Sequence, residues 1–291
     1  MIDRLTIIGV GLIGGSLARA LKSAGAVKEV VGTSRSIQHL QRARELGVVD
    51  RIEIDMGAAV SDADIVVVAV PVGAMESVFT EIATHLSDKT VLTDVGSSKA
   101  SVVEAAQKAF GKIPDNFVPA HPIAGTEKSG VENSFAELFQ QRRVILTPTN
   151  SSSDSAVSLV RGMWEQVGAI VTEISVPHHD EVLAATSHLP HLLAFALVDT
   201  LATMDDKQEI FDYAAGGFSD FTRIASSDPL MWHDICVHNE PALLTMLDRF
   251  TADLNRLRKA IAENDSDFLL QVFSRAKAAR DQLATNSNAS E

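Results

Sequence analysis

The chain has 291 residues, of which 46% are apolar and 22% charged, and this composition excludes a disordered protein. Its net charge of -13 argues against nucleic acid and anionic membranes as partners, because both bind cationic surfaces. The single cysteine, Cys236, excludes an internal disulfide and a cysteine-based zinc site, and the spacing of the histidines indicates no other metal site.

The first half of the chain alternates short β-branched runs with amphipathic helical patterns, which is typical of parallel strands joined by crossover helices. Strands are predicted at residues 5–10, 29–34, 65–70, 90–95, 117–120 and 144–147, and a short one at 169–174. The run at 65–70 is apolar throughout, as in a strand covered on both faces. We therefore expect an α/β fold in which residues 1–176 form a Rossmann-type, doubly wound parallel sheet that binds a dinucleotide.

A Gly-x-Gly-x-x-Gly motif follows the first predicted strand and opens a helix. Gly9 permits the tight turn, Gly11 lets the backbone approach a pyrophosphate, and Gly14 allows the helix to pack closely on the strand. The free amides at the helix start, at Leu12 and Ile13 among others, would bind the diphosphate. The motif predicts a nicotinamide dinucleotide cofactor, the alternative being glycines that serve only the turn.

Two further strand ends bear on the cofactor. An NAD-specific site places an acidic residue about 20 residues after the glycine loop, but Ser34 stands there. Ser34 and Ser36 could donate hydrogen bonds to a 2′-phosphate and Arg35 could pair with its charge, which favours NADP. The alternative is that Arg35 stacks on the adenine or faces solvent, leaving a site that accepts NADP and NAD. Val70 and Pro71 would border the nicotinamide ribose, unless Pro71 merely ends its strand.

From about residue 177 the sequence shows only helical periodicity, with helices predicted at 180–204, 207–213, 240–263 and 268–283, and a disordered polar tail at 286–291. Residues 177–291 are therefore expected to form an all-helical domain that binds substrate and dimerises. Because the helix around 189–201 is apolar on every face and its domain is small, we expect a homodimer through this half.

No secretory signal pattern opens the chain. The longest apolar stretch, residues 192–198 with its flanks, is shorter than the roughly 20 residues of a membrane span, so it is expected to be a buried helix. A cytoplasmic protein is predicted.

Histidine 121 is the first candidate for chemistry. His121 precedes Pro122 at the carboxyl end of a predicted strand, beside a glycine-rich turn, where a fixed imidazole could meet a bound ligand. A lone histidine is more often a satisfied structural residue. Two other segments, residues 94–99 and 186–191, fall where they could join it.

The chain resembles the prephenate and arogenate dehydrogenase family of tyrosine biosynthesis. The resemblance covers nearly the whole chain and rests on residues 9–14, 94–97, 121–130, 187–191 and 216–225. Of these, the string from His121 to Gly130 is the most specific.

This resemblance implies an oxidative decarboxylation, in which a cyclohexadienyl ring loses hydride and carbon dioxide and becomes a phenol. It implies that a neutral His121 accepts the C4 hydroxyl proton and that Ser97 holds this hydroxyl. Arg223 would bind a substrate carboxylate, with a surface salt bridge as the alternative. By position in the family motifs, His191 and Thr126 are further substrate-binding candidates.

Other polar residues have structural interpretations. His188 is either a substrate-binding residue or a packing histidine that donates to a backbone carbonyl. The cluster at 178–181 is expected to cap the N-terminus of its helix. Trp232 and His233 are expected to pack near Arg223 in a structural role.

Two alternative functions stay open. A β-hydroxyacid dehydrogenase or imine reductase has a similar two-domain build but usually needs a catalytic lysine in the helical domain, where no isolated lysine has a suitable setting. A non-catalytic NADP sensor would keep the glycine loop but would not need Ser97, His121 and Arg223 together. The sequence does not distinguish prephenate from arogenate, which differ only in a keto or amino group.

Overall fold

The computed structural model describes the backbone of residues 1–288 and the side chains of residues 1–283. The chain divides into two compact units, Met1–Leu243 and Leu244–Glu291. The first unit holds both β-sheets and the helices as far as α11 (Pro229–His238). Helix α12 (Glu240–Glu263) begins in the first unit and continues into the second, which also holds α13 (Ser266–Asn288).

The larger sheet of the first unit has six parallel strands in the order β3-β2-β1-β4-β5-β6. The strands are β1 (Ile2–Ile8), β2 (Val27–Thr33), β3 (Arg51–Ile52), β4 (Ile65–Val68), β5 (Val91–Asp94) and β6 (Phe117–Val118). The expected Rossmann-type sheet is confirmed. The sequence did not predict β3, because a strand of two residues shows no periodicity.

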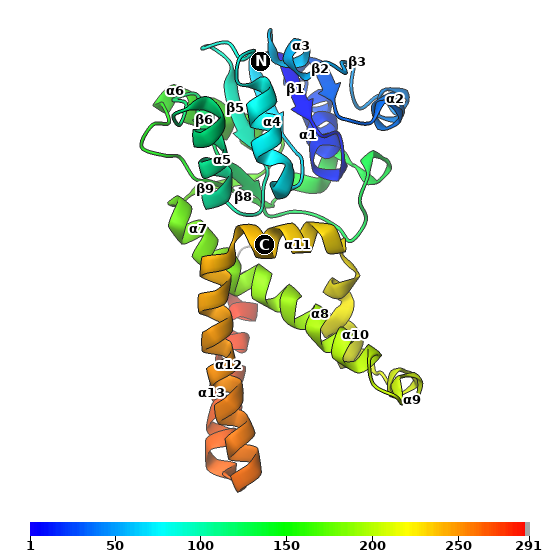
Figure 1. The fold of residues 1–291 in the computed structure, drawn as a ribbon, viewed down its shortest axis with the longest axis vertical. Helices are drawn as coiled ribbons and strands as arrows, with labels where there is room; N and C mark the ends of the chain where they lie inside the picture. Colours follow the sequence, from blue (N-terminus) through cyan, green and yellow to red (C-terminus); the bar gives the residue numbers. More distant parts are fainter. Residues whose placement is uncertain (289–291) are drawn as a thin grey trace. The chain divides into compact units, whose positions relative to one another are not determined.

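Helices cover both faces of this sheet, as the apolar run of β4 predicts. Ile65 and Val67 belong to one core, whereas Val66 and Val68 belong to the other, because successive side chains of a strand point to opposite faces. The first core includes side chains of α1 (Leu12–Ser23), α2 (Ile37–Glu45) and α6 (Asp154–Gln166). The second includes α3 (Met56–Val60), α4 (Met75–Ile82) and α5 (Ala100–Phe110) (Figure 1).

A second sheet of three strands corrects part of the predicted topology. Its strands are β7 (Ala120–Pro122), β8 (Arg143–Leu146) and β9 (Ile170–Glu173), with β7 antiparallel and β9 parallel to β8. Residues 117–120 are therefore not one strand, and 144–147 do not extend the parallel sheet. The chain changes sheets at Pro119, which has no amide to donate to a neighbouring strand. His121 consequently lies within β7.

The helix predicted at 180–204 is interrupted. It consists of α7 (Val176–Leu183), a π-helical segment η4 (Ala184–His188) and α8 (Leu189–Ala202). Pro190 explains the interruption, because it cannot donate to the carbonyl one turn earlier and its ring crowds that turn.

The rest of the helical half adds elements that the sequence did not predict. These are α10 (Gly216–Thr222), the 3-10 helix η5 (Arg223–Ser226) and α11, whereas α9 (Lys207–Asp212) and α12 match their predictions. Residues 286–288 belong to α13, so the predicted disordered tail is wrong there, and its remaining residues, 289–291, lie outside the described part of the chain.

Helix α8 is much less buried than predicted. Only its residues Leu189 and Ala194 are buried among the described residues. The stretch Val176–Ala202 is long and apolar enough, by length and composition, to cross a membrane. It nevertheless carries His179, Asp180 and His188 buried inside the first unit, as expected for a helix that lines a site in a folded protein.

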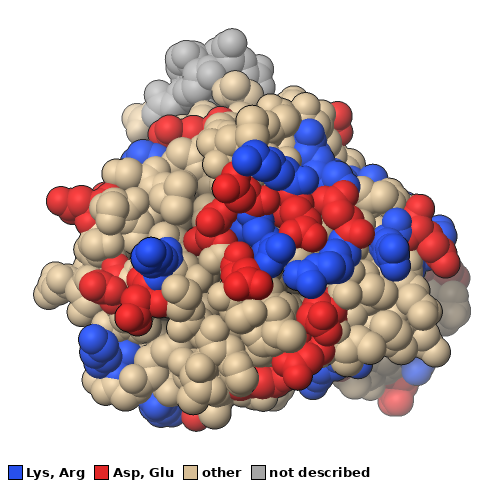
Figure 2. Space-filling view, turned by 90° about the horizontal axis from the view of Figure 1, so that it is seen from above, with Lys and Arg blue, Asp and Glu red and all other residues tan. Residues whose placement is uncertain are grey.

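The surface around the N-terminal ends of β1 and β2 carries mixed charge. Arg4 pairs with Glu29 at 2.7 Å, Lys28 with Asp3 at 2.6 Å, and Arg51 with Glu29 at 3.6 Å. Figure 2 shows Lys and Arg side chains interleaved with Asp and Glu on the face seen there. That face therefore alternates in sign and does not present a continuous basic surface.

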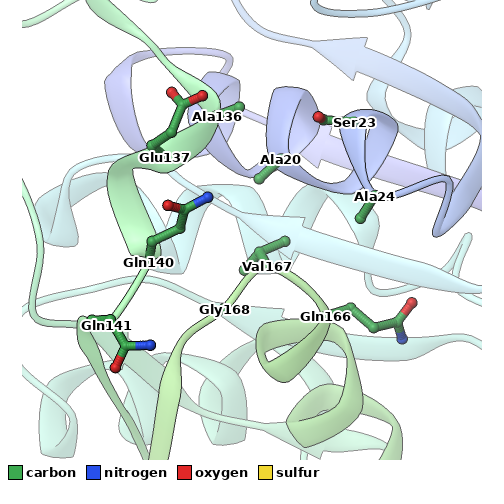
Figure 3. A pocket seen from close by; sticks show the side chains of 10 residues that line it. All are labelled: Ala20, Ser23, Ala24, Ala136, Glu137, Gln140, Gln141, Gln166, Val167 and Gly168. Atoms are coloured by element: carbon green, nitrogen blue, oxygen red, sulfur yellow. The ribbon is translucent and has the colours of Figure 1, made fainter.

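A pocket of about 420 Å³ opens beside the C-terminal part of α1 (Figure 3). Its wall is rich in uncharged polar side chains, and its ten lining residues include none of the site residues predicted from the sequence. The lining residues are Ala20, Ser23, Ala24, Ala136, Glu137, Gln140, Gln141, Gln166, Val167 and Gly168.

Candidate active site

The three glycines of the loop have different structural needs. Gly9 has φ +95°, and a Cβ there would lie 2.5 Å from the carbonyl oxygen of Ala69. A Cβ on Gly14 would lie 2.6 Å from the carbonyl oxygen of Gly9. A Cβ on Gly11 would meet nothing within 4 Å. Packing therefore requires glycine at positions 9 and 14, whereas Gly11 borders open space that a ligand could enter.

The start of α1 fits an anionic group. Its N-cap is Gly11, which provides no side-chain cap, and its first turn contains no acidic residue. The amides of Leu12, Ile13 and Gly14 have no acceptor within the helix by geometry, so they are available to a diphosphate. The strand order reverses between β1 and β4, which is where sheets of this type bind ligands.

The residues that follow β1 and β4 meet at the glycine loop. The Gly9 Cβ position lies 3.0 Å from a methyl group of Val70, so the residues after β1 and β4 meet at the loop. Strand β4 ends at Val68, short of the predicted residue 70, and Pro71 is the N-cap residue of a short 3-10 helix, η1 (Val72–Ala74). The open space at Gly11 and the uncapped start of α1 thus fit a dinucleotide.

After β2, the residues expected to face the adenosine ribose are polar and accessible. The Ser34 hydroxyl contacts the backbone N and O atoms of Ser36 at 3.3 and 3.2 Å. Ser36 caps α2 by accepting from the amide of His39, and Arg35 is exposed. No carboxylate stands at these three positions.

His121 belongs to a buried relay of three residues. Its Nδ1 lies 2.9 Å from Nε2 of His179, and Nδ1 of His179 lies 2.7 Å from Oδ1 of Asp180. Burial lowers the pKa of His121 well below its ordinary value, and the neighbouring His179 and Lys99 lower it further. The imidazole is therefore neutral near pH 7.

The relay fixes the tautomer of His121. Burial acts to raise the pKa of Asp180, but hydrogen bonds from His179 and from the amides of Lys99 and Ala100 outweigh it, so the net pKa is lowered. An ionised Asp180 only accepts, so the Nδ1 hydrogen of His179 points to it. Nε2 of His179 then accepts from Nδ1 of His121. This leaves Nε2 of His121 with a free lone pair, as a proton acceptor requires.

The predicted role of residues 178–181 as a cap of their own helix is wrong. The N-cap of α7 is Ser175, which makes no side-chain cap bond. Asp180 instead accepts from the amides of Lys99 and Ala100, both at 2.8 Å, and so caps the start of α5. The sequence could not show this because the two segments meet only in the tertiary structure.

His188 is buried and neutral, and its ring takes part in a hydrogen-bond network with the relay, while its predicted part in substrate binding stays a prediction. Its Nδ1 accepts from Nδ2 of Asn239 at 2.9 Å, and the same amide group donates to the backbone oxygen of Asp180 at 3.0 Å. Burial lowers the pKa of His188 to about 4. It therefore ties α11's end to the relay instead of donating to a carbonyl.

His191 stacks on Trp232, the tryptophan that was expected to pack near Arg223. The two rings stack with centroids 3.7 Å apart and planes 17° apart. Nδ1 of His191 donates a hydrogen bond to the carbonyl oxygen of Ser187, 2.8 Å away. Nε2, on the other side of the ring, therefore points away from Ser187. The half-buried ring has a lowered pKa because of burial, and Arg223 adds to the effect.

Arg223 is 63% exposed and pairs with Glu127 across 96 positions of sequence. Glu127 follows Thr126, whose hydroxyl contacts the backbone of Lys128 at 3.1 Å. The pKa of Glu127 is lowered by its own backbone hydrogen bond and by Arg223. The guanidinium of Arg223 thus binds a carboxylate, that of Glu127, in this structure.

The remaining predicted residue, Ser97, is half-buried in the turn between β5 and α5. In the same turn the structure places a buried ion pair of Asp94 and Lys99 that the sequence analysis did not use. The missed residues of this region are Asp94, Lys99, His179, Asp180 and Asn239. What these residues share is an ionisable or amide side chain in apolar surroundings. Such surroundings are only weakly visible in a sequence.

Among the described residues, no group of three or more His, Cys, Asp or Glu side chains is arranged to hold a metal ion.

Two family descriptions match successive parts of the chain. They are "Prephenate dehydrogenase, nucleotide-binding domain" over residues 17–173 and "Prephenate dehydrogenase, dimerization domain" over residues 175–275. The chain belongs to the prephenate dehydrogenase family. This membership supports the prephenate or arogenate dehydrogenase interpretation over the alternatives of a β-hydroxyacid dehydrogenase or imine reductase and of a non-catalytic sensor.

Individual relatives that match nearly the whole chain carry the names of the same family. A cyclohexadienyl dehydrogenase of Zymomonas mobilis is 42% identical over 285 residues, covering 97% of this chain and 96% of the relative. A prephenate dehydrogenase of Bacillus subtilis is 34% identical over 287 residues, covering 97% of this chain and 76% of the relative.

A crystal structure of the Aquifex aeolicus prephenate dehydrogenase with hydroxyphenyl propionate and NAD+ has a TM-score of 0.90 and 36% identity. It covers 97% of this chain and 99% of its own. A 3-hydroxyisobutyrate dehydrogenase of Mycobacterium tuberculosis, at 14% identity and a TM-score of 0.52, covers 82% of this chain and 94% of its own, and it shares the fold alone.

Proposed function

We propose that this chain oxidatively decarboxylates prephenate, arogenate or both, with a nicotinamide dinucleotide as hydride acceptor. The observation that carries the proposal is the relay of Asp180, His179 and His121, which leaves one imidazole nitrogen free as a base. Family membership supplies the substrate class, since the Zymomonas mobilis relative is named a cyclohexadienyl dehydrogenase.

In this mechanism Nε2 of His121 accepts the proton of the C4 hydroxyl of the ring. Ser97, in the turn after β5, hydrogen-bonds the same hydroxyl and holds it in line for the reaction. When bound, the nicotinamide supplies the acceptor for the C4 hydride. The bond from the ring to its carboxylate then breaks, its electron pair completes the aromatic ring, and carbon dioxide leaves.

The neutral state of His121 suits this role. A protonated imidazole could not accept the hydroxyl proton, and the low pKa of His121 keeps the lone pair available at neutral pH. The relay lets the imidazolium that forms share its charge with Asp180 through His179.

Arg223 is the proposed carboxylate-binding residue. A substrate carboxylate would replace Glu127, which supplies the same group to Arg223 in this structure. His191, Thr126 and His188 border the same region and are proposed to shape the substrate site.

We further propose that NADP is preferred over NAD. Ser34 in place of a carboxylate and the exposed Arg35 support this, because a carboxylate would repel the 2′-phosphate. Catalytic efficiency with each cofactor should favour NADP in the parent and shift toward NAD in Ser34→Asp. A parent that prefers NAD would reject the preference while leaving the reaction itself intact.

Steady-state kinetics with prephenate and arogenate, each with both cofactors, test the reaction directly. We expect turnover of at least one substrate, with one carbon dioxide released for each reduced cofactor formed. Absence of turnover with all four combinations in a folded protein that binds the cofactor would reject the proposed function.

We also propose a cytoplasmic homodimer that assembles through the helical half. The matched description of residues 175–275 as a dimerization domain and the exposed apolar side chains of α12 and α13 support it. The division into a dinucleotide domain at 1–176 and a helical domain at 177–291 stays a prediction.

A further inference from the structure

The ion pair of Asp94 and Lys99 is the most deeply buried charged pair among the described residues, with both side chains fully inaccessible to solvent. It belongs to no step of the reaction proposed above. Nζ of Lys99 donates to Oδ2 of Asp94 and to the backbone oxygen of Ala120 at 2.7 Å. Oδ1 of Asp94 accepts from the amide of Ala120 at 3.2 Å.

These contacts hold both backbone polar atoms of Ala120, the residue that directly precedes His121. Ala120 begins β7 just after the chain leaves the parallel sheet at Pro119. Within a sheet, a neighbouring strand supplies the hydrogen-bond partners of the backbone. At this change of sheets, the side chains of Asp94 and Lys99 supply them to Ala120. The backbone that carries His121 is therefore anchored by the pair.

The pair also connects to the other side of His121. The amide of Lys99 donates to Oδ1 of Asp180 at 2.8 Å, and Asp180 accepts from His179, whose Nε2 lies 2.9 Å from His121. The polar contacts thus form a closed ring that runs from the backbone of Ala120 through the ion pair and the relay to the His121 imidazole. Lys99 therefore holds His121 from two sides. Its Nζ binds the backbone of the preceding residue, and its amide binds Asp180 of the relay that contacts the imidazole.

Stability alone does not account for a buried ion pair. The cost of removing two charges from water offsets their attraction, and apolar residues of similar volume often serve as well. Desolvated ionisable groups cluster at functional sites, so an ion pair buried beside the proposed base is a candidate for a role in that site.

We propose that Lys99, held by Asp94, is a positioning residue for His121, which fixes its backbone and keeps a positive charge beside its imidazole so that the base stays unprotonated. The inference rests on the proposed function, in which His121 must be neutral. His179 of α7 and His188 of η4 also act on His121, and Asp180 of α7 contacts His179. Of these groups and Asp94, Lys99 alone combines a contact to the preceding carbonyl with a positive charge.

The experiment compares the parent with Lys99→Met and with the surface control Lys108→Met. Lys108 lies in α5, the helix that Lys99 precedes as N-cap residue, and its side chain is 64% exposed. The ¹³Cε1 signal of His121, assigned by its loss in His121→Asn, is titrated in each protein. Removing the positive charge should move the midpoint for His121 up by on the order of one pH unit. The acid limb of kcat/KM should move up with it. Lys108→Met should leave both unchanged.

Because Lys99→Met leaves Asp94 buried without its partner, a second variant that combines Lys99→Met with Asp94→Asn replaces it if the single variant does not fold. This double variant should move both readouts in the same direction by a smaller amount. A His121 titration that coincides with the parent's in a folded variant would overturn the inference, whatever the loss of activity. If His121→Asn retains full turnover, the proposed base fails instead, and the titration still judges Lys99 separately.

Discussion

At the scale of single residues, the site depends on which nitrogen of an imidazole is free. Asp180 determines this for His179, and His179 determines it for His121. The chemistry of the site is therefore set by a carboxylate that lies two residues away along the relay and never needs to touch the substrate.

His121→Asn should lower turnover by a factor on the order of 100 to 10,000, the usual contribution of a general base, while cofactor affinity changes little. Asparagine keeps a polar side chain but cannot accept the proton at the same position. Turnover is measured across pH, with His178→Asn, an exposed neighbour of the relay, as the control. Near-parental turnover of His121→Asn at every pH contradicts the assignment.

Arg223→Ala should reduce kcat/KM for the substrate on the order of ten- to a hundredfold through loss of a charge-assisted contact. Binding of the cofactor should stay within a factor of about two, measured by fluorescence titration, because the arginine is assigned to the substrate. Arg256→Ala, an exposed arginine of α12, is the control. Equal weakening of substrate and cofactor would show that Arg223 maintains the fold and not the substrate site.

At the scale of elements, the glycine loop separates folding from binding. Gly11→Ala adds a methyl group into open space, so the free energy of unfolding should change by less than about 1 kcal/mol while dinucleotide affinity falls at least tenfold. Gly9→Ala should instead destabilise the protein, because the added methyl meets Ala69 and the backbone has positive φ. Urea unfolding and cofactor titration of both variants check this. Unchanged affinity in Gly11→Ala would show that the diphosphate does not approach that residue.

The exposed apolar side chains of α13 give a test of assembly. Phe273 is 59% exposed, and Phe273→Glu should weaken the homodimer at least tenfold because a charge would enter an apolar interface. Sedimentation over a range of concentrations measures this. Ile54→Glu, at a residue 64% exposed in the first unit, should leave the dimer intact. Equal dissociation of both variants would point to general destabilisation.

At the scale of the whole molecule, buried neutral histidines make stability depend on pH. The pKa of His188 is about 4 in the folded chain and about 6.5 when unperturbed, so the unfolded chain takes up the proton first. The stabilisation is complete above pH 6.5 and is lost as pH falls toward 4, by on the order of 3 kcal/mol.

Urea unfolding at pH 7, 5.5 and 4.5 checks this, with His188→Gln expected to lose less stability on acidification than the parent. His178→Gln, at an exposed position, should follow the parent. Identical pH dependence in the parent and His188→Gln would show that the buried imidazole is not the source.

The sequence by itself determined the parallel sheet, the glycine loop and the helical second half. These features are encoded locally, by an apolar run such as Ile65–Val68, by glycines at fixed spacing and by 3.6-residue periodicity. It also singled out His121 and Arg223 as candidates, because both lie within the motifs on which the family resemblance rests.

Only the tertiary structure decided how the polar residues pair. Pro119 moves His121 to a second sheet, and α7 then brings Asp180 to the start of α5, 80 residues away. Contacts over such distances leave no periodic trace in a sequence, because any polar residue on either segment would give the same local pattern. The protonation of His121 likewise follows from burial and from Lys99, which are properties of the folded chain.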